Sequence, residues 1–244
     1  MASLIKKHAP ICGDAAGKGI VRFEVGPHHV RYAIHKAFLA EHSSPGGLMD
    51  RVLSQQGVIN MHSIACTTFE VMVNWLYVQR IQPPDQAIDA DGVTTLSQKN
   101  FLTYLDVYIF ADFCGIPVLR RSMNHEISWW CRVHAVKKHM SLQNAIMMAW
   151  NVIPHDRVIW ESLVEAYLGA WDFGNPDYSA TALEQLPSTF IKRVMRRAAE
   201  LARRSQEDKD KFRCYLEHAD DEEKQKCPDL HMRYDEELEV AFFE

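Results

Sequence analysis

Apolar and polar residues alternate in the first ordered part of the chain. Residues 21–25 and 30–34 both alternate with a period of two, and Gly26-Pro27-His28 between them is a turn sequence. Successive side chains of a strand point to opposite faces, so this pattern predicts a β-hairpin with one face in the core and one in water. A third strand is predicted at 58–61.

The other apolar positions recur with the spacing of helices. Phe69, Met72, Val73 and Leu76 lie at i, i+3, i+4 and i+7, which places one apolar stripe on the core side of a helix. Helices are also predicted at 35–40, at 48–53, from Phe101 to a left-handed cap at Gly115, from Pro117 through Trp130, and after Ser141, Pro154 and Pro187.

Three finer features accompany this pattern. Thr67-x-x-Glu70 is a capping-box sequence, so we expect the Thr67 hydroxyl and the Glu70 carboxylate to accept hydrogen bonds from backbone N–H groups at a helix start. Ser141 is expected to cap the helix that follows it. The polar segment 82–99 is predicted to be a long surface loop behind the helix that Pro83-Pro84 terminates.

Composition and charge restrict the class of protein. Hydrophobic residues make up 47% of the 244 positions and charged residues 24%, which is typical of a globular chain. The net charge of −5 is too small to drive binding to nucleic acid or to anionic lipid. Asp106 and Asp112 interrupt the most apolar stretch, so no membrane span is predicted. No secretory signal is recognised, and six scattered cysteines fit reduced thiols in the cytoplasm or nucleus.

Two Cys/His pairs raise the question of a metal site. Cys214 and His218, and then Cys227 and His231, are each four positions apart. Zn²⁺ prefers thiolate and imidazole ligands, and a closed site has four. The link of eight residues between the pairs is unlike that of a common zinc finger, and it contains four acidic residues. The sequence leaves a zinc site and a solvated tail open as interpretations, and we assign no metal ligand.

A basic helix is the second candidate site. The helix after Pro187 carries Lys192, Arg193, Arg196, Arg197, Arg203 and Arg204. Such a face can contact phosphate groups, but Glu200, Glu207 and Asp208 dilute its charge. It also lacks interleaved aromatic residues on which bases could stack. A solvated helix face is therefore favoured over a nucleic-acid interface.

Motifs of catalysis are not found in the sequence. There is no nucleophile elbow, His-Glu-x-x-His or paired catalytic carboxylate pattern. Gly13-x-x-x-Gly17-Lys18 is one residue short of a phosphate-binding loop, and Gly19 stands where Ser or Thr would hold magnesium. His35 is expected to cap or pack rather than to act as a base. We therefore expect a chain that is not an enzyme, with no catalytic or cofactor-binding residues.

Three blocks, in this order, resemble the BTB/POZ domain, most strongly its fungal members. They are Val25-Gly26-Pro27 with Ile34-His35-Lys36-Ala37-Phe38-Leu39 and His42-Ser43-Ser44-Pro45, then Phe69-Glu70-x-Met72-Val73-Asn74-Trp75-Leu76-Tyr77, and then Leu105-x-Val107-Tyr108-x-Phe110-Ala111-Asp112-x-x-x-Ile116-Pro117-x-Leu119-Arg120. Leu186-Pro187-x-x-Phe190 is similar to the helical extension behind many fungal members.

The resemblance implies an α+β fold in which a small mixed sheet packs on a helical cluster, followed by an α-helical extension. The expected organisation is a flexible segment at 1–19, the BTB/POZ domain at 20–132, the extension at 133–213 and an acidic, polar tail at 214–244. The implied function is non-enzymatic binding to other proteins, as a homodimer or through an adaptor.

Two alternatives to this function remain. One is a substrate-recruiting adaptor of a cullin-3 ubiquitin ligase, and the other is a transcription-associated protein that uses the basic helix at 192–204. The segment Ser54-Gln55-Gln56-Gly57 lacks the hydrophobic-x-Glu element of cullin-3 adaptors. A second departure is Gly46-Gly47, where family members place a large aromatic residue.

Overall fold

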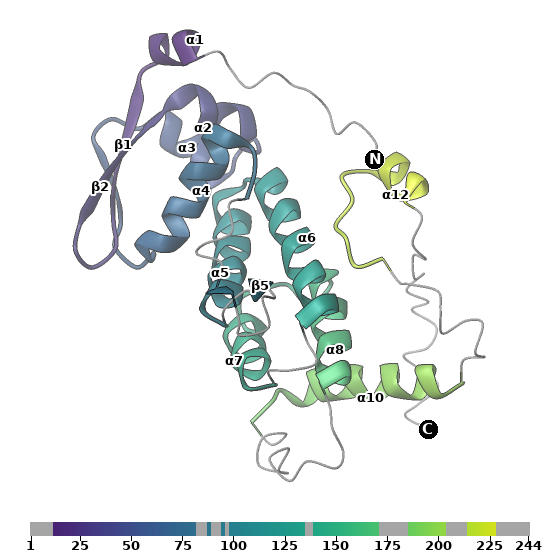
Figure 1. Cartoon of the computed structure of the whole chain (residues 1–244). Helices are drawn as coiled ribbons and strands as arrows, with labels where there is room; N and C mark the ends of the chain where they lie inside the picture. Colours follow the sequence, from purple (N-terminus) through teal and green to yellow (C-terminus); the bar gives the residue numbers. More distant parts are fainter. Residues whose placement is uncertain are drawn as a thin grey trace.

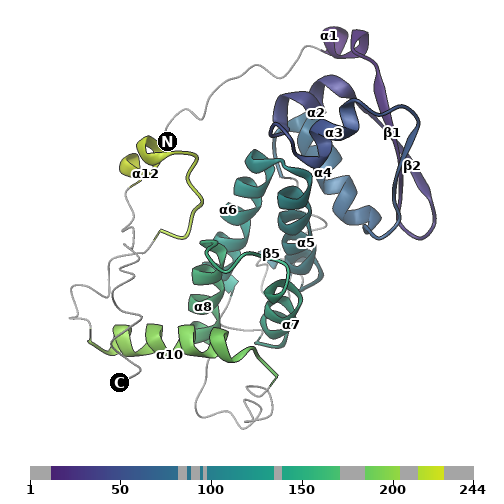
Figure 2. The same ribbon diagram turned by 180° about the vertical axis from the view of Figure 1, so that it is seen from behind.

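The computed structural model has a mixed α+β architecture, which confirms the predicted class (Figure 1). It describes residues 12–81, 87–88, 94–95, 98–134, 139–170, 185–203 and 214–227. The three-stranded sheet and the helices α1–α4 (within residues 12–78) lie at one end of the molecule, and the helices α7, α8 and α10 (within residues 139–203) lie at the other. The helices α5 and α6 connect the two ends, as the view from behind also shows (Figure 2).

The predicted strands form a small mixed sheet. Strands β1 (Ile20–Val25) and β2 (Val30–His35) pair antiparallel, and β3 (Val58–Met61) pairs parallel with β1, in the order β2-β1-β3. Alternate residues of β1 are buried, namely Val21, Phe23 and Val25. The period of two in the sequence therefore corresponds to one core face and one outer face.

Helices α2 (Lys36–His42) and α3 (Leu48–Leu53) follow the hairpin and lie where they were predicted. The backbone before α3 approaches the corner between α5 and α6 closely. A Cβ atom built on Gly115 would lie 3.0 Å from the Cα atom of Gly47. The Ser44 N–H also donates to the Gly115 carbonyl at 2.7 Å. The glycine at position 47, a departure from the BTB/POZ pattern, thus lies where two backbones meet.

Helix α4 (Cys66–Val78) buries the predicted stripe, with Phe69, Met72 and Leu76 fully inside the core. The capping box is wrong. The N-cap is Ala65, two residues before Thr67, and its side chain makes no capping hydrogen bond. Glu70 instead accepts a hydrogen bond from the Tyr32 hydroxyl at 2.9 Å, so tertiary contact with the hairpin takes the carboxylate away from the local backbone.

The segment 82–99 differs from the predicted continuous loop. Strands β4 (Ala87–Ile88) and β5 (Thr94–Thr95) pair antiparallel, and α5 already begins at Gln98. Each strand is only two residues long, which is too short for a period of two to be recognised in the sequence. Pro83 and Pro84 lie outside the described residues.

Helices α5 (Gln98–Cys114) and α6 (Pro117–His134) form the helical pair that was predicted. Gly115 between them has φ 71°, the left-handed cap expected from sequence. The predicted inward face of α6, from Leu119 to Trp130, is buried. The Trp130 ring stacks on Phe101 of α5 at a centroid distance of 4.0 Å.

The extension consists of α7 (His139–Trp150), α8 (Ile159–Ala170) and α10 (Ser188–Arg203). Ser141 is not an N-cap as predicted, because α7 already begins at His139. Aromatic contacts hold these helices together: Phe190 of α10 packs edge-on against Tyr167 of α8 at 5.7 Å. The buried apolar residues of the extension and of the strand-containing end belong to one cluster.

Two short helices were not predicted at all. Helix α1 (Cys12–Gly17) falls in the segment 1–19 that was expected to be flexible, and Ala15 on it is fully buried. Helix α12 (Asp221–Lys226) lies in the expected acidic tail. Neither contains enough apolar residues to give a helical period in the sequence.

None of the described helices combines the length and the apolar character that crossing a bilayer requires.

Candidate functional site

A polar stripe on α6 holds the chain segment 214–218. Arg120, Asn124 and Ser128 are four residues apart and therefore share one face of the helix. The Glu217 N–H donates to Asn124 Oδ1 at 2.8 Å, and Ser128 Oγ donates to the Tyr215 carbonyl at 3.1 Å. The segment thus runs antiparallel to α6, and both ribbon views show it beside that helix (Figures 1 and 2).

An ion-pair network lies at one end of this segment. Arg120 donates from Nε to Glu217 at 2.8 Å and from Nη1 to Asp112 at 2.5 Å, and Arg157 donates to the same Asp112 oxygen at 3.0 Å. The Tyr108 hydroxyl also donates to Glu217. Asp112 and Arg120, both in the third block of the resemblance, are therefore partners that join α5 to α6.

The local environment shifts the pKa of two members of this network. Burial, followed by the charge of Glu217 and its hydrogen bond, raises the pKa of the Tyr108 phenol well above its ordinary value. Burial lowers the pKa of Arg120, but the hydrogen bond to Glu217 and the negative charges of Glu217 and Asp112 outweigh it, so the pKa is raised. Tyr108 is therefore a hydrogen-bond donor here and Arg120 a fixed cation.

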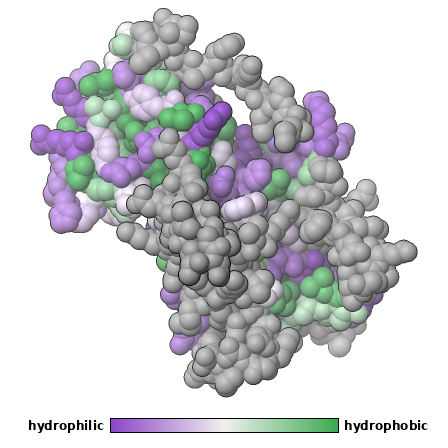
Figure 3. Space-filling model, viewed as in Figure 1, coloured by the Kyte–Doolittle hydropathy of each residue, from purple (hydrophilic) through white to green (hydrophobic). Residues whose placement is uncertain are grey.

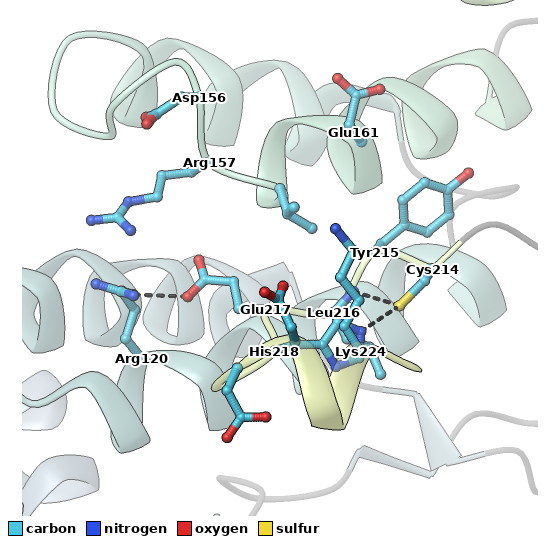
Figure 4. A pocket seen from close by; sticks show the side chains of 13 residues that line it. Arg120, Asp156, Arg157, Glu161, Cys214, Tyr215, Leu216, Glu217, His218 and Lys224 are labelled. Atoms are coloured by element: carbon cyan, nitrogen blue, oxygen red, sulfur yellow. Dashed lines mark hydrogen bonds and ion pairs between the residues drawn. The ribbon is translucent and has the colours of Figure 1, made fainter. Parts of the chain in front are cut away.

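An open pocket of about 620 Å³ lies between this network and the start of α8 (Figure 4). Its wall includes Arg120 and Glu217 on one side and Arg157 and Glu161 on the other. The rest of the lining comes from Asp156 and Val158 and from residues 214–218, 220, 221 and 224. The pocket wall therefore carries charged groups of both signs. Several of these groups already form ion pairs with one another or with other residues of the chain.

Three of the four sequence-predicted Cys/His candidates converge beside this pocket. Cys214 Sγ lies 3.2 Å from His218 Nε2 and 3.6 Å from Cys227 Sγ. All three ligand atoms lie within 4.8 Å of one another. The fourth candidate, His231, lies outside the described residues. Residues 214–218 form neither a helix nor a strand, so the local course of the backbone, and not helical spacing, brings Cys214 and His218 together.

The basic helix becomes α10, and the structure uses part of its charge internally. Arg197 is buried and pairs with Glu165 of α8 and with Glu200. Arg193 donates to the His155 carbonyl at 2.7 Å. Arg196 and Arg203 are exposed, and Arg204 lies outside the described residues. The face of α10 that was expected to be solvated therefore packs in part against α8, because the apolar side of this amphipathic helix lies against the core.

The structure also shows where the other positions singled out in the sequence lie. Gly13 and Gly17 belong to α1 rather than to a loop between a strand and a helix. His35 is the N-cap residue of α2 but its side chain makes no capping hydrogen bond, so of the two expected roles, cap or packing residue, it has the second. It packs beside Tyr77, whose hydroxyl lies 2.8 Å from His35 Nδ1. The exposed segment 54–57 simply joins α3 to β3.

A second titratable cluster, at the tip of the hairpin, was missed. Glu24 Oε1 lies 2.8 Å from His29 Nδ1 and 3.4 Å from His62 Nε2, while Glu24 Oε2 lies 3.4 Å from Arg31. The hydrogen bond from His29 lowers the pKa of Glu24, against a smaller opposing effect of burial. The alternation of β1 puts Glu24 on the outer face, but the sequence does not show that residue 62 returns to it.

Two carboxyl groups of the helical pair are half-buried, which disfavours their charged form. Desolvation raises the pKa of Asp106 on α5 and of Glu126 on α6. The charge of Glu126 also adds to burial in raising the pKa of Tyr104 to about 12. At neutral pH the folded state therefore carries these charges at a cost that the unfolded state does not have.

We expect Asp106→Asn and Glu126→Gln to raise the thermal unfolding midpoint at pH 7. An acid with a raised pKa binds its proton more tightly when folded, so wild-type stability falls as pH rises from the unfolded pKa, about 4, through the folded pKa. The neutral variants escape that loss. Thermal unfolding followed by circular dichroism at pH 7 and near pH 3.5 tests this, because the advantage should disappear at the lower pH. A gain that persists there contradicts the electrostatic cause.

Comparisons with known proteins add no relative. No protein-family model matches this chain, and a search of curated proteins found no significant match.

Proposed function

We propose that this chain is a protein–protein interaction module of the BTB/POZ type that associates with a second copy of itself. The packing of the three blocks in the resemblance carries the proposal. Ile34 of the first block, Trp75 of the second and Ala111 of the third are all buried in one core. The order of hairpin, two short helices, third strand, α4 and helical pair is the order that the resemblance implies.

The outer face of the sheet is the surface that we assign to association. Ile20 and Val58 are 45% and 47% exposed although both are apolar. Val58 pairs with Arg22, and Arg22 lies two residues after Ile20 on the same face of β1, so Ile20 and Val58 are diagonal neighbours across the sheet. Figure 3 shows hydrophobic side chains at the surface of this end of the molecule.

Two features of this face favour a second copy as the partner. The sheet order leaves β2 and β3 as edge strands, which can accept another strand by backbone hydrogen bonds. The same face carries Arg22 and Glu24, two residues apart. Around a twofold axis the same patch contacts itself, so Arg22 of each copy can approach Glu24 of the other, beside the contacts that Glu24 makes with His29 and Arg31 of its own chain. A stable dimer of this kind must bury roughly 1,200 Å² or more in total.

Introducing a charge at either member of the apolar pair tests the proposal. We expect the wild-type chain to be dimeric at high micromolar concentration and Val58→Glu to weaken the dimer at least tenfold, or about 1.4 kcal/mol. The measurement is multi-angle light scattering coupled to size exclusion, with circular dichroism to show that the variant is folded. Ile20→Glu should have a similar effect.

The matched control is Val152→Glu. Val152 is also apolar and 57% exposed, but it follows α7 at the opposite end of the molecule. It should leave the dimer unchanged. A wild-type chain that is monomeric throughout this concentration range, or equal weakening by Val152→Glu, would overturn the proposal.

A further inference from the structure

We propose that Cys214, His218 and Cys227 provide three of the four ligands of a Zn²⁺ ion, which joins the two ends of the segment 214–227 and holds it against α6. The distances between the ligand atoms carry the inference. With zinc–sulfur bonds of about 2.3 Å and zinc–nitrogen bonds of about 2.0–2.1 Å, a tetrahedral site places two sulfurs about 3.8 Å apart and sulfur and nitrogen about 3.5 Å apart. The observed separations are 3.6 Å between the sulfurs and 3.2 Å between Cys214 Sγ and His218 Nε2.

The chemistry of the three groups selects zinc. Two thiolates and one imidazole are soft and borderline ligands, which suit Zn²⁺ and not the oxygen-seeking Mg²⁺ or Ca²⁺. The Leu216 N–H donates to Cys214 Sγ at 3.4 Å, and this hydrogen bond stabilises negative charge on the sulfur (Figure 4). Two thiolates also neutralise the charge of one Zn²⁺.

Helix α12 gives an independent reason for a cross-link. It is six residues long and none of its residues is buried. Local bonds support it: Asp220 caps the Glu223 N–H at 2.8 Å, and Glu223 in turn accepts from the Ala219 N–H at 2.6 Å. An isolated helix of this length is not stable in water. A metal that joins Cys214 before the helix to Cys227 at its C-cap supplies the stabilisation that a core would otherwise provide.

The cross-link also connects the segment to the rest of the fold. Cys214 is adjacent to Tyr215, whose carbonyl accepts from Ser128, and His218 is adjacent to Glu217, which pairs with Arg120. The first two metal ligands therefore lie on either side of the residues that dock on α6. Zinc binding orders this segment, and loss of zinc should release residues 218–227 before it affects the helical core.

Zinc content of the full chain tests the site. We expect protein produced with supplemented zinc, carrying no polyhistidine tag and dialysed against metal-free buffer, to retain one zinc ion per chain by mass spectrometry of the metal. Cys214→Ser and Cys227→Ser should each lose at least nine-tenths of it. Cobalt added to the metal-free wild-type chain should give the intense visible bands of tetrahedral thiolate coordination, and these bands should be absent in both variants.

Cys66→Ser is the matched control, because Cys66 is also a half-buried free thiol but lies on α4, remote in sequence from Cys214 and Cys227. It should retain zinc in full. Circular dichroism of each variant shows whether the helical core is folded. Three results would overturn the site. The first is loss of zinc from the wild type on dialysis, which means an adventitious ion only, and the second is an equal zinc content in the wild type and Cys214→Ser. The third is a count of four instead of six free thiols in the denatured, unreduced chain, which indicates a Cys214–Cys227 disulfide.

Discussion

Replacing Gly115 with alanine is expected to lower the free energy of unfolding by about 2–5 kcal/mol. Two costs add at this position. The residue has φ 71°, and an L side chain in the left-handed region costs about 1–2 kcal/mol. The new Cβ would also lie 3.0 Å from the Cα atom of Gly47, and because backbone cannot rotate away, the overpacking costs about 1–3 kcal/mol more. Urea unfolding followed by circular dichroism measures the sum.

Two neighbouring glycines separate these costs. Gly46 has φ 76° but nothing within 4 Å of a built Cβ, so Gly46→Ala should cost only about 1 kcal/mol. Gly47 has φ −65° and meets Gly115 at 3.2 Å, so Gly47→Ala should show the overpacking alone. If Gly115→Ala is no more destabilising than Gly46→Ala, the two backbones do not pack as closely as we describe.

Replacing Arg120 with methionine is expected to cost about 3 kcal/mol of stability. Arg120 is the cation that joins Asp112 to Glu217, and its side chain is only 17% exposed. Removing one partner of a buried ion pair leaves charge uncompensated, which costs about 3–5 kcal/mol, while methionine preserves most of the packing volume. We expect the lower part of this range because Asp112 keeps its bond to Arg157. Urea unfolding again gives the magnitude.

Hydrogen exchange should locate the effect of this variant. The amide of Glu217, which donates to Asn124, should exchange faster in Arg120→Met, because the docked segment loses its main ionic contact. Arg121→Met is the control: Arg121 is the next residue on α6 and makes no ion pair within the described residues. It should change stability by less than about 0.5 kcal/mol. Similar losses in both variants would contradict the network.

Periodicity predicted most of the elements at the strand-containing end. The hairpin, β3, α4 and the α5–α6 corner all have a repeating apolar pattern, and a repeat of two or of 3.6 residues is a property of the local sequence. The failures have a different cause. The Thr67 and Ser141 caps were wrong because α4 and α7 begin earlier, and Glu70 binds Tyr32 rather than the helix start. Hydrogen-bonding side chains have several possible partners, and only the fold selects one.

The candidate site was predictable in its composition but not in its assembly. The paired spacing of Cys214, His218 and Cys227 is visible in the sequence, which could not distinguish a zinc site from a tail. The polar stripe of Arg120, Asn124 and Ser128 was missed, although its spacing of four beside the inward face of α6 is a recognisable signal. Its partners lie about ninety positions later in the chain, and a local pattern contains no information about that distance.

The sequence by itself determined the α+β class, the order along the chain of β1, β2, β3 and the main helices, and the side of these elements that enters the core, because hydrophobic burial depends on the period of apolar residues. The tertiary structure alone decided which polar groups meet. It directs Arg197 to Glu165, brings Gly47 against Gly115, and seats the segment 214–218 on α6. Such contacts require specific distances between remote parts of the chain, and these distances exist only once the apolar surfaces have packed.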